Sequence, residues 1–242
     1  MKSIHQLNFT RKSFKTVIKL GVICCVVLCF YGCQTDIDIT EGTAPNQNTN
    51  TANSETTKSF RRISMLDGSA DDLIDNNPCG LVVLPVSLVA NGVSVTLNTL
   101  ADLAQVETIF NQSNTDVDTI EFNFPIQVTK YDYTTQNVLN QNGLNDLITE
   151  CDELTLNNDD PITCVDFEYP FQFSIYNSNL NLFDVIDVSS DVALFSFIEN
   201  LLPVDIYSAK YPITVFEAGP INTLINSDNE LESIISNCTN SF

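Results

Sequence analysis

Four segments of the chain follow one pattern of apolar and polar positions. Each opens with an apolar or aromatic residue and a proline, continues as two alternating runs separated by a turn, and ends in an apolar stripe of helical spacing. The prolines are spaced by 40, 45 and 42 residues: Pro85, Pro125, Pro170 and Pro212. This spacing predicts four ββα repeats. Because proline has no amide for a sheet ladder, each should lie at the first paired residue of a strand or on an edge strand.

Turn and helix-start signals agree with this pattern. Asn91 and Gly92 lie between two alternating runs, which predicts a type I′ hairpin turn. Ser227 and Glu230 have capping-box spacing at the start of the last helix. The apolar stripes that predict one helix in each unit are Leu103, Val106 and Phe110; Leu144, Leu147 and Ile148; Leu194, Phe197 and Ile198; and Leu231, Ile234 and Ile235.

The cysteines group the repeats in pairs. Cys79 and Cys164 each lie six residues before a repeat proline. Cys151 and Cys238 each lie 26 residues after one. In an exported protein this symmetry favours two disulfides, Cys79 with Cys151 and Cys164 with Cys238. The alternative connectivity joins Cys151 to Cys164 and Cys79 to Cys238.

One hairpin with one helix is too small to fold alone, so we expect the repeats to pair. The predicted fold is α+β, with two homologous (ββα)₂ halves whose antiparallel sheets carry helices on one face. The halves comprise residues 79–154 and 164–242, and residues 155–163 form the linker between them.

The first 32 residues predict an export signal. Met1 to Lys19 holds five basic residues and no acidic one, and an apolar run follows that ends at Cys33. This run is shorter than the about 20 apolar residues that a bilayer crossing requires.

The end of the signal, Phe30-Tyr31-Gly32-Cys33, resembles the lipobox of bacterial lipoproteins. The resemblance implies that Cys33 is diacylated and becomes the mature N-terminus, which would anchor the protein to a membrane without a transmembrane helix. Phe30 and Tyr31 depart from the usual lipobox residues. Cleavage without a lipid and an uncleaved anchor are the alternatives.

Residues 33–78 are predicted to form a flexible polar tether, because the Asn- and Thr-rich part after Cys33 has too few large apolar residues to offset its ordering entropy. Asp36 and Asp38 resemble the acidic export tags of lipoproteins sent to the outer face of the outer membrane; ordinary solvated charges are the alternative. We therefore expect an envelope protein, anchored at the outer membrane and displayed at the surface.

Charge narrows the range of partners. All 31 acidic residues lie beyond the signal, where five basic residues remain, so the net charge there is 5 − 31 = −26. Such a field repels phosphate backbones and anionic headgroups, which argues against nucleic acid and against peripheral lipid binding. The membrane contact would come only from the N-terminal lipid, and a protein or a glycan is the expected partner.

Missing residue types argue against an enzyme. The only histidine is His5, within the signal, and the chain has no tryptophan. The chain beyond the signal therefore lacks the histidine that Ser-His-Asp and Cys-His catalytic systems and histidine-ligated zinc sites require. A carboxylate-based glycoside hydrolase needs no histidine, and Glu121, Asp166 and Glu168 are near the strand starts, but they fit no motif.

Acidic clusters and tyrosines supply the remaining candidates. Asp159, Asp160, Asp184 and Asp187 carry the hard oxygen ligands that Ca²⁺ prefers, although no EF-hand spacing occurs. Tyr131, Tyr133 and Tyr176, near the hairpin tips, are candidates for an exposed ligand surface. The leading hypothesis is a non-catalytic binding or structural module; the alternatives are a Ca²⁺-dependent adhesion module and a glycoside hydrolase.

Overall fold

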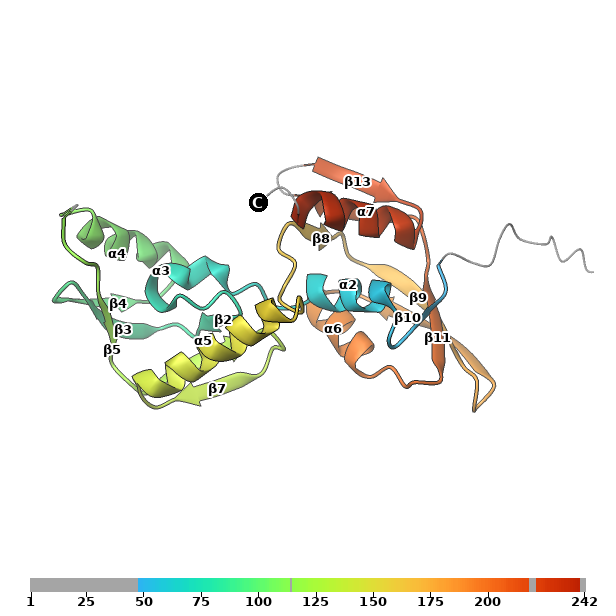
Figure 1. The fold of residues 1–242 in the computed structure, drawn as a ribbon, viewed down its shortest axis with the longest axis horizontal. Coiled ribbons are helices and arrows are strands. Elements are labelled where there is room, and N and C mark those ends of the chain that lie inside the picture. The colour runs from blue at the N-terminus through green and yellow to red at the C-terminus, as the bar shows by residue number, and fades with distance from the viewer. Residues whose placement is uncertain (1–47, 114, 218–220, 240–242) are drawn as a thin grey trace, which may run out of the picture. The chain divides into compact units, whose positions relative to one another are not determined.

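The computed structural model describes residues 48–113, 115–217 and 221–239 (Figure 1). These residues form an α+β fold with six α-helices and four small antiparallel sheets. The predicted export signal, Cys33, Asp36 and Asp38 lie outside the described residues. Within these ranges, no helix combines the length and the apolar character that a membrane crossing requires.

Two hairpins form the centre of the first half. Each hairpin receives a third strand from the segment that precedes the proline of the other hairpin, so that β2 joins the second hairpin and β5 joins the first. The strands are β2 (Gly80–Val82), β3 (Val86–Ala90), β4 (Val93–Leu97), β5 (Ile120–Phe122), β6 (Ile126–Lys130) and β7 (Thr135–Val138). The resulting sheets have the orders β4-β3-β5 and β2-β6-β7.

The second half shows the same reciprocal exchange of strands. Here β8 pairs with β12, and β11 pairs with β9. The strands are β8 (Val165–Phe167), β9 (Phe171–Asn177), β10 (Leu182–Val188), β11 (Asp205–Ala209), β12 (Ile213–Glu217) and β13 (Ile221–Ile225). The two-residue strand β1 (Asn50–Thr51) adds to β11, which gives the sheet order β1-β11-β9-β10 beside β13-β12-β8.

The prolines mark the points at which the exchange occurs. Each lies one residue before the first residue of β3, β6, β9 or β12, next to the predicted first paired position, and each follows a cis peptide bond. The strand before the proline belongs to one sheet and the strand after it to another. The strands of each half therefore form two antiparallel sheets, since the ladder stops where proline provides no amide.

All four expected helices are confirmed: α4 (Leu103–Phe110), α5 (Gln141–Leu156), α6 (Asp191–Glu199) and α7 (Asp228–Thr239). At the starts of α5, α6 and α7 side chains cap the free amides, as Asn140 does by accepting from the Gly143 amide at 3.1 Å. Tyr169, the residue before Pro170, also contacts the start of a helix. Its hydroxyl donates a hydrogen bond to the Asp191 carboxylate at the start of α6, at 2.6 Å. The Asn91-Gly92 turn has positive φ at both residues, as a type I′ turn requires.

The prediction of a flexible tether is wrong for residues 48–78. This segment contains helices α2 (Glu55–Ile63) and α3 (Asp72–Asp75), and α2 supplies Phe60 and Ile63 to the core of the second half. Phe60 is fully buried and contacts the rings of Phe167 and Phe173. Two large apolar residues at i, i+3 are enough for helix burial here, because the core of the second half provides the surface that a short helix needs.

Both disulfides have the predicted connectivity. Cys79 bonds to Cys151 and Cys164 to Cys238, across sequence separations of 72 and 74 residues. Each disulfide therefore joins the start of one half to its last helix. Disulfides of this kind are typical of an oxidising, extracytoplasmic compartment.

The burial of α2 can be tested by truncating its central aromatic residue. Phe60→Ala should lower the free energy of unfolding by about 3–5 kcal/mol, because it removes a buried ring and leaves a cavity. Chemical denaturation measures this change. Leu156→Ala is the matched control, since Leu156 is 84% exposed on α5. Equal, small effects of the two substitutions would contradict the place of α2 in the core.

Candidate functional site

The outer face of the β1-β11-β9-β10 sheet carries an exposed apolar row. Strand alternation directs Phe173 and Tyr207 into the core and directs Tyr176 outward. Tyr176 lies opposite Phe183 on β10 and opposite Ile206 on β11, so the three side chains form one cross-strand row. Their exposed fractions are 36%, 64% and 39%.

The turn of the hairpin orients this row. Asn181, in the turn between β9 and β10, adopts a positive φ of 50° and accepts a hydrogen bond from the Tyr176 hydroxyl at 2.9 Å. The ring of Tyr176 is therefore partly exposed to solvent, while its hydroxyl is hydrogen-bonded within the same hairpin. Leu180 in the turn is 72% exposed, and Leu182, which alternation places on the other face of β10, is 58% exposed. In Figure 1 this hairpin tip projects away from the helices at the lower right.

The core side of the same hairpin borders an open apolar groove of about 450 Å³ against α6. Its apolar lining consists of Ile175, Ile186, Ala193, Phe197 and Leu201. Apolar surface is thus available on both faces of the distal β9–β10 hairpin. Exposed apolar patches of this kind, next to polar residues, are typical of interaction sites.

A second groove, of about 490 Å³, lies beside α2 and is mainly polar. Lys58 and Arg62 from α2 and Glu232 from α7 are among its lining residues. Its cations already have partners: Lys58 pairs with Glu55 at 2.9 Å, and Arg62 pairs with Asp160 at 3.2 Å. Both of these cations are therefore already paired within the chain, so the groove presents no unpaired lysine or arginine from α2 to an anionic ligand.

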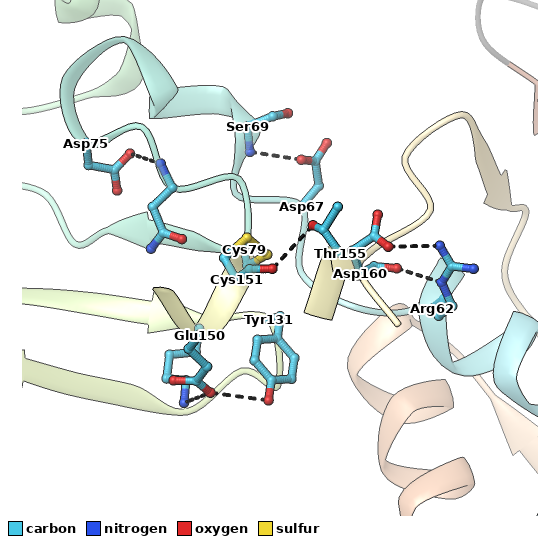
Figure 2. Close-up of a disulfide and its surroundings, with 12 residues drawn as sticks. Arg62, Asp67, Ser69, Asp75, Cys79, Tyr131, Glu150, Cys151, Thr155 and Asp160 are labelled. Atoms are coloured by element: carbon cyan, nitrogen blue, oxygen red, sulfur yellow. Dashed lines mark hydrogen bonds and ion pairs between the residues drawn. A yellow bond between two sulfur atoms is a disulfide. The ribbon is translucent and has the colours of Figure 1, made fainter. Parts of the chain in front are cut away.

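The acidic candidates for Ca²⁺ are not gathered into one site. Asp159 and Asp160 pair with Arg61 and Arg62, as Figure 2 shows for Arg62 and Asp160. Asp184 and Asp187 lie on β10, where Asp187 accepts from the Gln172 side chain at 2.6 Å. Among the described residues, no three histidine, cysteine or acidic side chains are placed to hold a metal ion.

The three candidate tyrosines have different environments. The Tyr131 hydroxyl donates to Glu150 at 3.3 Å, next to the Cys79–Cys151 disulfide (Figure 2). The Tyr133 hydroxyl donates to the Ser64 carbonyl at 2.8 Å, and burial raises the pKa of this phenol. Tyr131 and Tyr133 thus support the structure internally. Only Tyr176 belongs to an exposed apolar surface.

The carboxylates considered for glycoside hydrolysis are also separated. Glu121 lies on β5 of the first half, whereas Asp166 lies on β8 of the second half. Glu168 follows β8, and its amide donates to the Thr214 carbonyl at 3.0 Å. None of the three lines either groove described above.

A buried carboxylate cluster beside α3 was missed in the sequence. Asp71 and Asp75 are 1% and 4% exposed, and Asp71 accepts from the Val82 amide at 2.8 Å while Asp75 accepts from the Asn77 amide at 3.1 Å (Figure 2 draws Asp75). Each keeps one oxygen without a hydrogen-bond partner. None of the ion pairs in the described part of the chain includes them.

Burial controls the protonation of this cluster. Burial, followed by the charge of Asp71, raises the pKa of Asp75 to about 8, and burial raises the pKa of Asp71 to about 6. The neighbouring Asp72 carboxyl also has a raised pKa, first through burial and then through Asp67. The only sequence signal was the spacing of acids at 71, 72 and 75, which is also common at exposed helix starts.

Comparison with known proteins adds no further assignment. No protein-family model matches this chain, and no curated protein or solved structure matches it. The functional argument therefore depends on the surfaces and contacts described above.

The Asp75 carboxyl predicts an unusual dependence of stability on pH. Because its pKa rises from 3.8 to about 8 on folding, the folded chain holds more protons than the unfolded chain between these values, so stability falls as pH rises through that window. Asp75→Asn should remove this loss and raise the melting temperature at pH 8 by about 2–8 °C, which corresponds to about 1–2 kcal/mol.

Thermal unfolding across pH 4 to 8 measures the effect of Asp75→Asn, with Asp152→Asn as the control because Asp152 is exposed on α5. The control should keep the wild-type pH profile. If Asp75→Asn keeps it as well, the carboxyl of Asp75 does not titrate in this window.

Proposed function

We propose that this chain is a non-catalytic binding module of the bacterial envelope that engages a protein partner through the outer face of its β9–β10 hairpin. The observation that carries the proposal is the cross-strand row of Tyr176, Phe183 and Ile206, which is exposed although all three side chains are large and apolar. Interfaces are enriched in aromatic side chains, and tyrosine suits them because it combines apolar area with a polar tip.

The position of the row supports this function. It lies on a hairpin whose base is buried in the second half, since Phe173 is fully buried and Phe171 nearly so. The base therefore holds the exposed end without requiring the apolar row to take part in the core. A flat, aromatic surface suits a macromolecular partner better than a small substrate, which needs a concave site.

The proposal includes attachment through a lipid on Cys33, supported by the resemblance of Phe30-Tyr31-Gly32-Cys33 to a lipobox. The tether is then shorter than the sequence predicts. Because the side chain of Asn50 donates to Asp228 at 2.7 Å and so attaches this residue to the second half, 16 residues separate Cys33 from the attached Asn50.

We also infer that the two halves arose by duplication of a (ββα)₂ unit. Support comes from the cysteines, which lie at the same distances from the prolines in both halves, and from the reciprocal strand exchange that both halves contain. Among the residues that the structure describes, an exposed aromatic hairpin face occurs only in the second half: on β3 and β4 the exposed side chains include Val93 but no aromatic residue. The binding surface is then a specialisation of one half.

The binding surface can be tested by crosslinking on intact cells that produce the full-length chain. Phe183→Ser should reduce the amount of captured partner about tenfold or more, because aromatic anchors of interfaces contribute about 2 kcal/mol or more. Leu224→Ser is the control, since Leu224 is 58% exposed on β13. Equal capture by both variants, or capture of a glycan alone, would contradict a protein partner at this surface.

Lipidation can be tested by fractionation and mass spectrometry. Cys33→Ser should move the protein from the membrane fraction to the soluble fraction and remove the mass of the acyl chains, because two or more chains are needed for stable anchoring. Cys29→Ser, within the signal, should leave both readouts unchanged. A wild-type chain without acyl mass would contradict the proposal.

A further inference from the structure

β10 is the free edge of the four-stranded sheet. The order β1-β11-β9-β10 places it at one end, and β1 already covers the opposite edge by pairing with β11. No described strand pairs with the outer side of β10. With seven residues it is as long as β9, so it offers a long row of backbone groups to an additional strand.

The register shows which backbone groups face outward. The Lys210 amide donates to the Gln172 carbonyl at 2.8 Å, so Gln172 faces β11. Successive residues of a strand direct their backbone groups to opposite sides, and the odd-numbered residues of β9 therefore bond to β10. Their register partners on β10 are the even-numbered residues 182–188. Phe183, Val185 and Asp187 consequently present their backbone groups to the free edge.

The side chain of Asp184 hydrogen-bonds to one of these outward backbone groups, the Val185 amide. Its carboxylate accepts a hydrogen bond from the Val185 amide at 2.7 Å. This contact satisfies the central amide of the edge in the absence of a partner and places a negative charge beside it. Charged side chains at an edge are a usual means of preventing uncontrolled strand pairing.

Apolar surface flanks the edge on both sides. Phe183 and Val185 point to the outer face, beside Tyr176. Ile186 points to the other face and lines the groove against α6. A strand added to β10 would place alternate side chains against each surface, which is how strand addition combines backbone affinity with side-chain specificity.

We propose that β10 accepts an extended, basic segment of the partner protein as an added β-strand. This inference rests on the proposed function and specifies how the partner binds. Charge complementarity identifies the segment: the chain beyond the signal has 31 acidic and five basic residues, and the edge itself carries Asp184 and Asp187. A lysine or arginine of the segment pairs with Asp184 and releases the Val185 amide to hydrogen-bond to the incoming strand.

A second copy of this chain fits the edge poorly. Two copies would bring together two molecules with the same charge of 5 − 31 = −26, and each copy would bring Asp184 and Asp187 to the new ladder. Like charges close together in a ladder are destabilising. A basic segment removes this repulsion, and self-association is an outcome that the experiment below detects.

The probe is a peptide of about nine residues that alternates lysine and valine, long enough to span β10. Protein produced from the full-length sequence is mixed with the labelled peptide, and binding is followed by fluorescence anisotropy at physiological salt. Val185→Pro should weaken binding about fivefold to tenfold, because it removes one outward amide and its hydrogen bond while the β9 ladder stays intact. Amide hydrogen exchange of Phe183 and Asp187 should slow when the peptide binds.

Asn137→Pro is the matched control. Asn137 lies on edge strand β7 of the first half, and its register with Gln127, whose carbonyl faces β2, gives it an outward amide as well. This variant should bind the peptide like the wild type. A glutamate–valine peptide of the same length should not bind.

Three results would overturn strand addition: equal binding by Val185→Pro and Asn137→Pro, unchanged exchange of the edge amides, or a concentration-dependent dimer that Val185→Pro abolishes. The proposed function is tested separately by Phe183→Ser on cells. Loss of capture there together with unchanged peptide binding by Val185→Pro would retain the binding surface and reject the added strand.

Discussion

The structure depends on a constraint at four prolines. A proline provides no amide to a sheet ladder, so pairing must stop where it occurs, and each segment around it divides into a strand before the proline and a strand after it. The strand before the proline pairs with the hairpin of the neighbouring unit, in both directions and in both halves. Neither hairpin of a half is then complete without the other. This mutual dependence explains how units too small to fold alone form a stable half.

The remaining contacts of each half reinforce this exchange. A disulfide ties the beginning of each half to its last helix. In the second half, Tyr169 and Tyr211, the residues before the two prolines, donate hydrogen bonds to Asp191 and Asp228 at the starts of α6 and α7. The N-terminal helix α2 then completes the core through Phe60 and pairs its arginines with the acids that follow α5. Four of the five lysines and arginines in the described part of the chain pair with carboxylates of the same chain.

The β9–β10 hairpin differs from these elements, because its distal part contributes no buried side chain to the core. Its base lies in the core, but its distal half exposes large apolar side chains on one face and borders an open groove on the other, next to a free edge strand. The exposed part of these apolar side chains carries a risk of aggregation that Asp184 and Asp187 reduce. The proposed binding role would account for this exposed surface, and the acidic side chains at its edge suit a partner with positive charge.

Several features followed from the sequence because they depend on local or regular signals: the Asn91-Gly92 turn, helices α4 to α7, the position of the prolines and both disulfide pairs. Other features required the tertiary structure. Strands of three residues such as β2 and β8 are too short to show a period, and α2 has only two large apolar residues, so neither could be separated from loop or tether. Tyr176 was a candidate from its type alone, but the exposed apolar row exists because register sets Phe183 and Ile206 beside it. Register is a property of paired strands and not of one strand, and for that reason only the fold decided it.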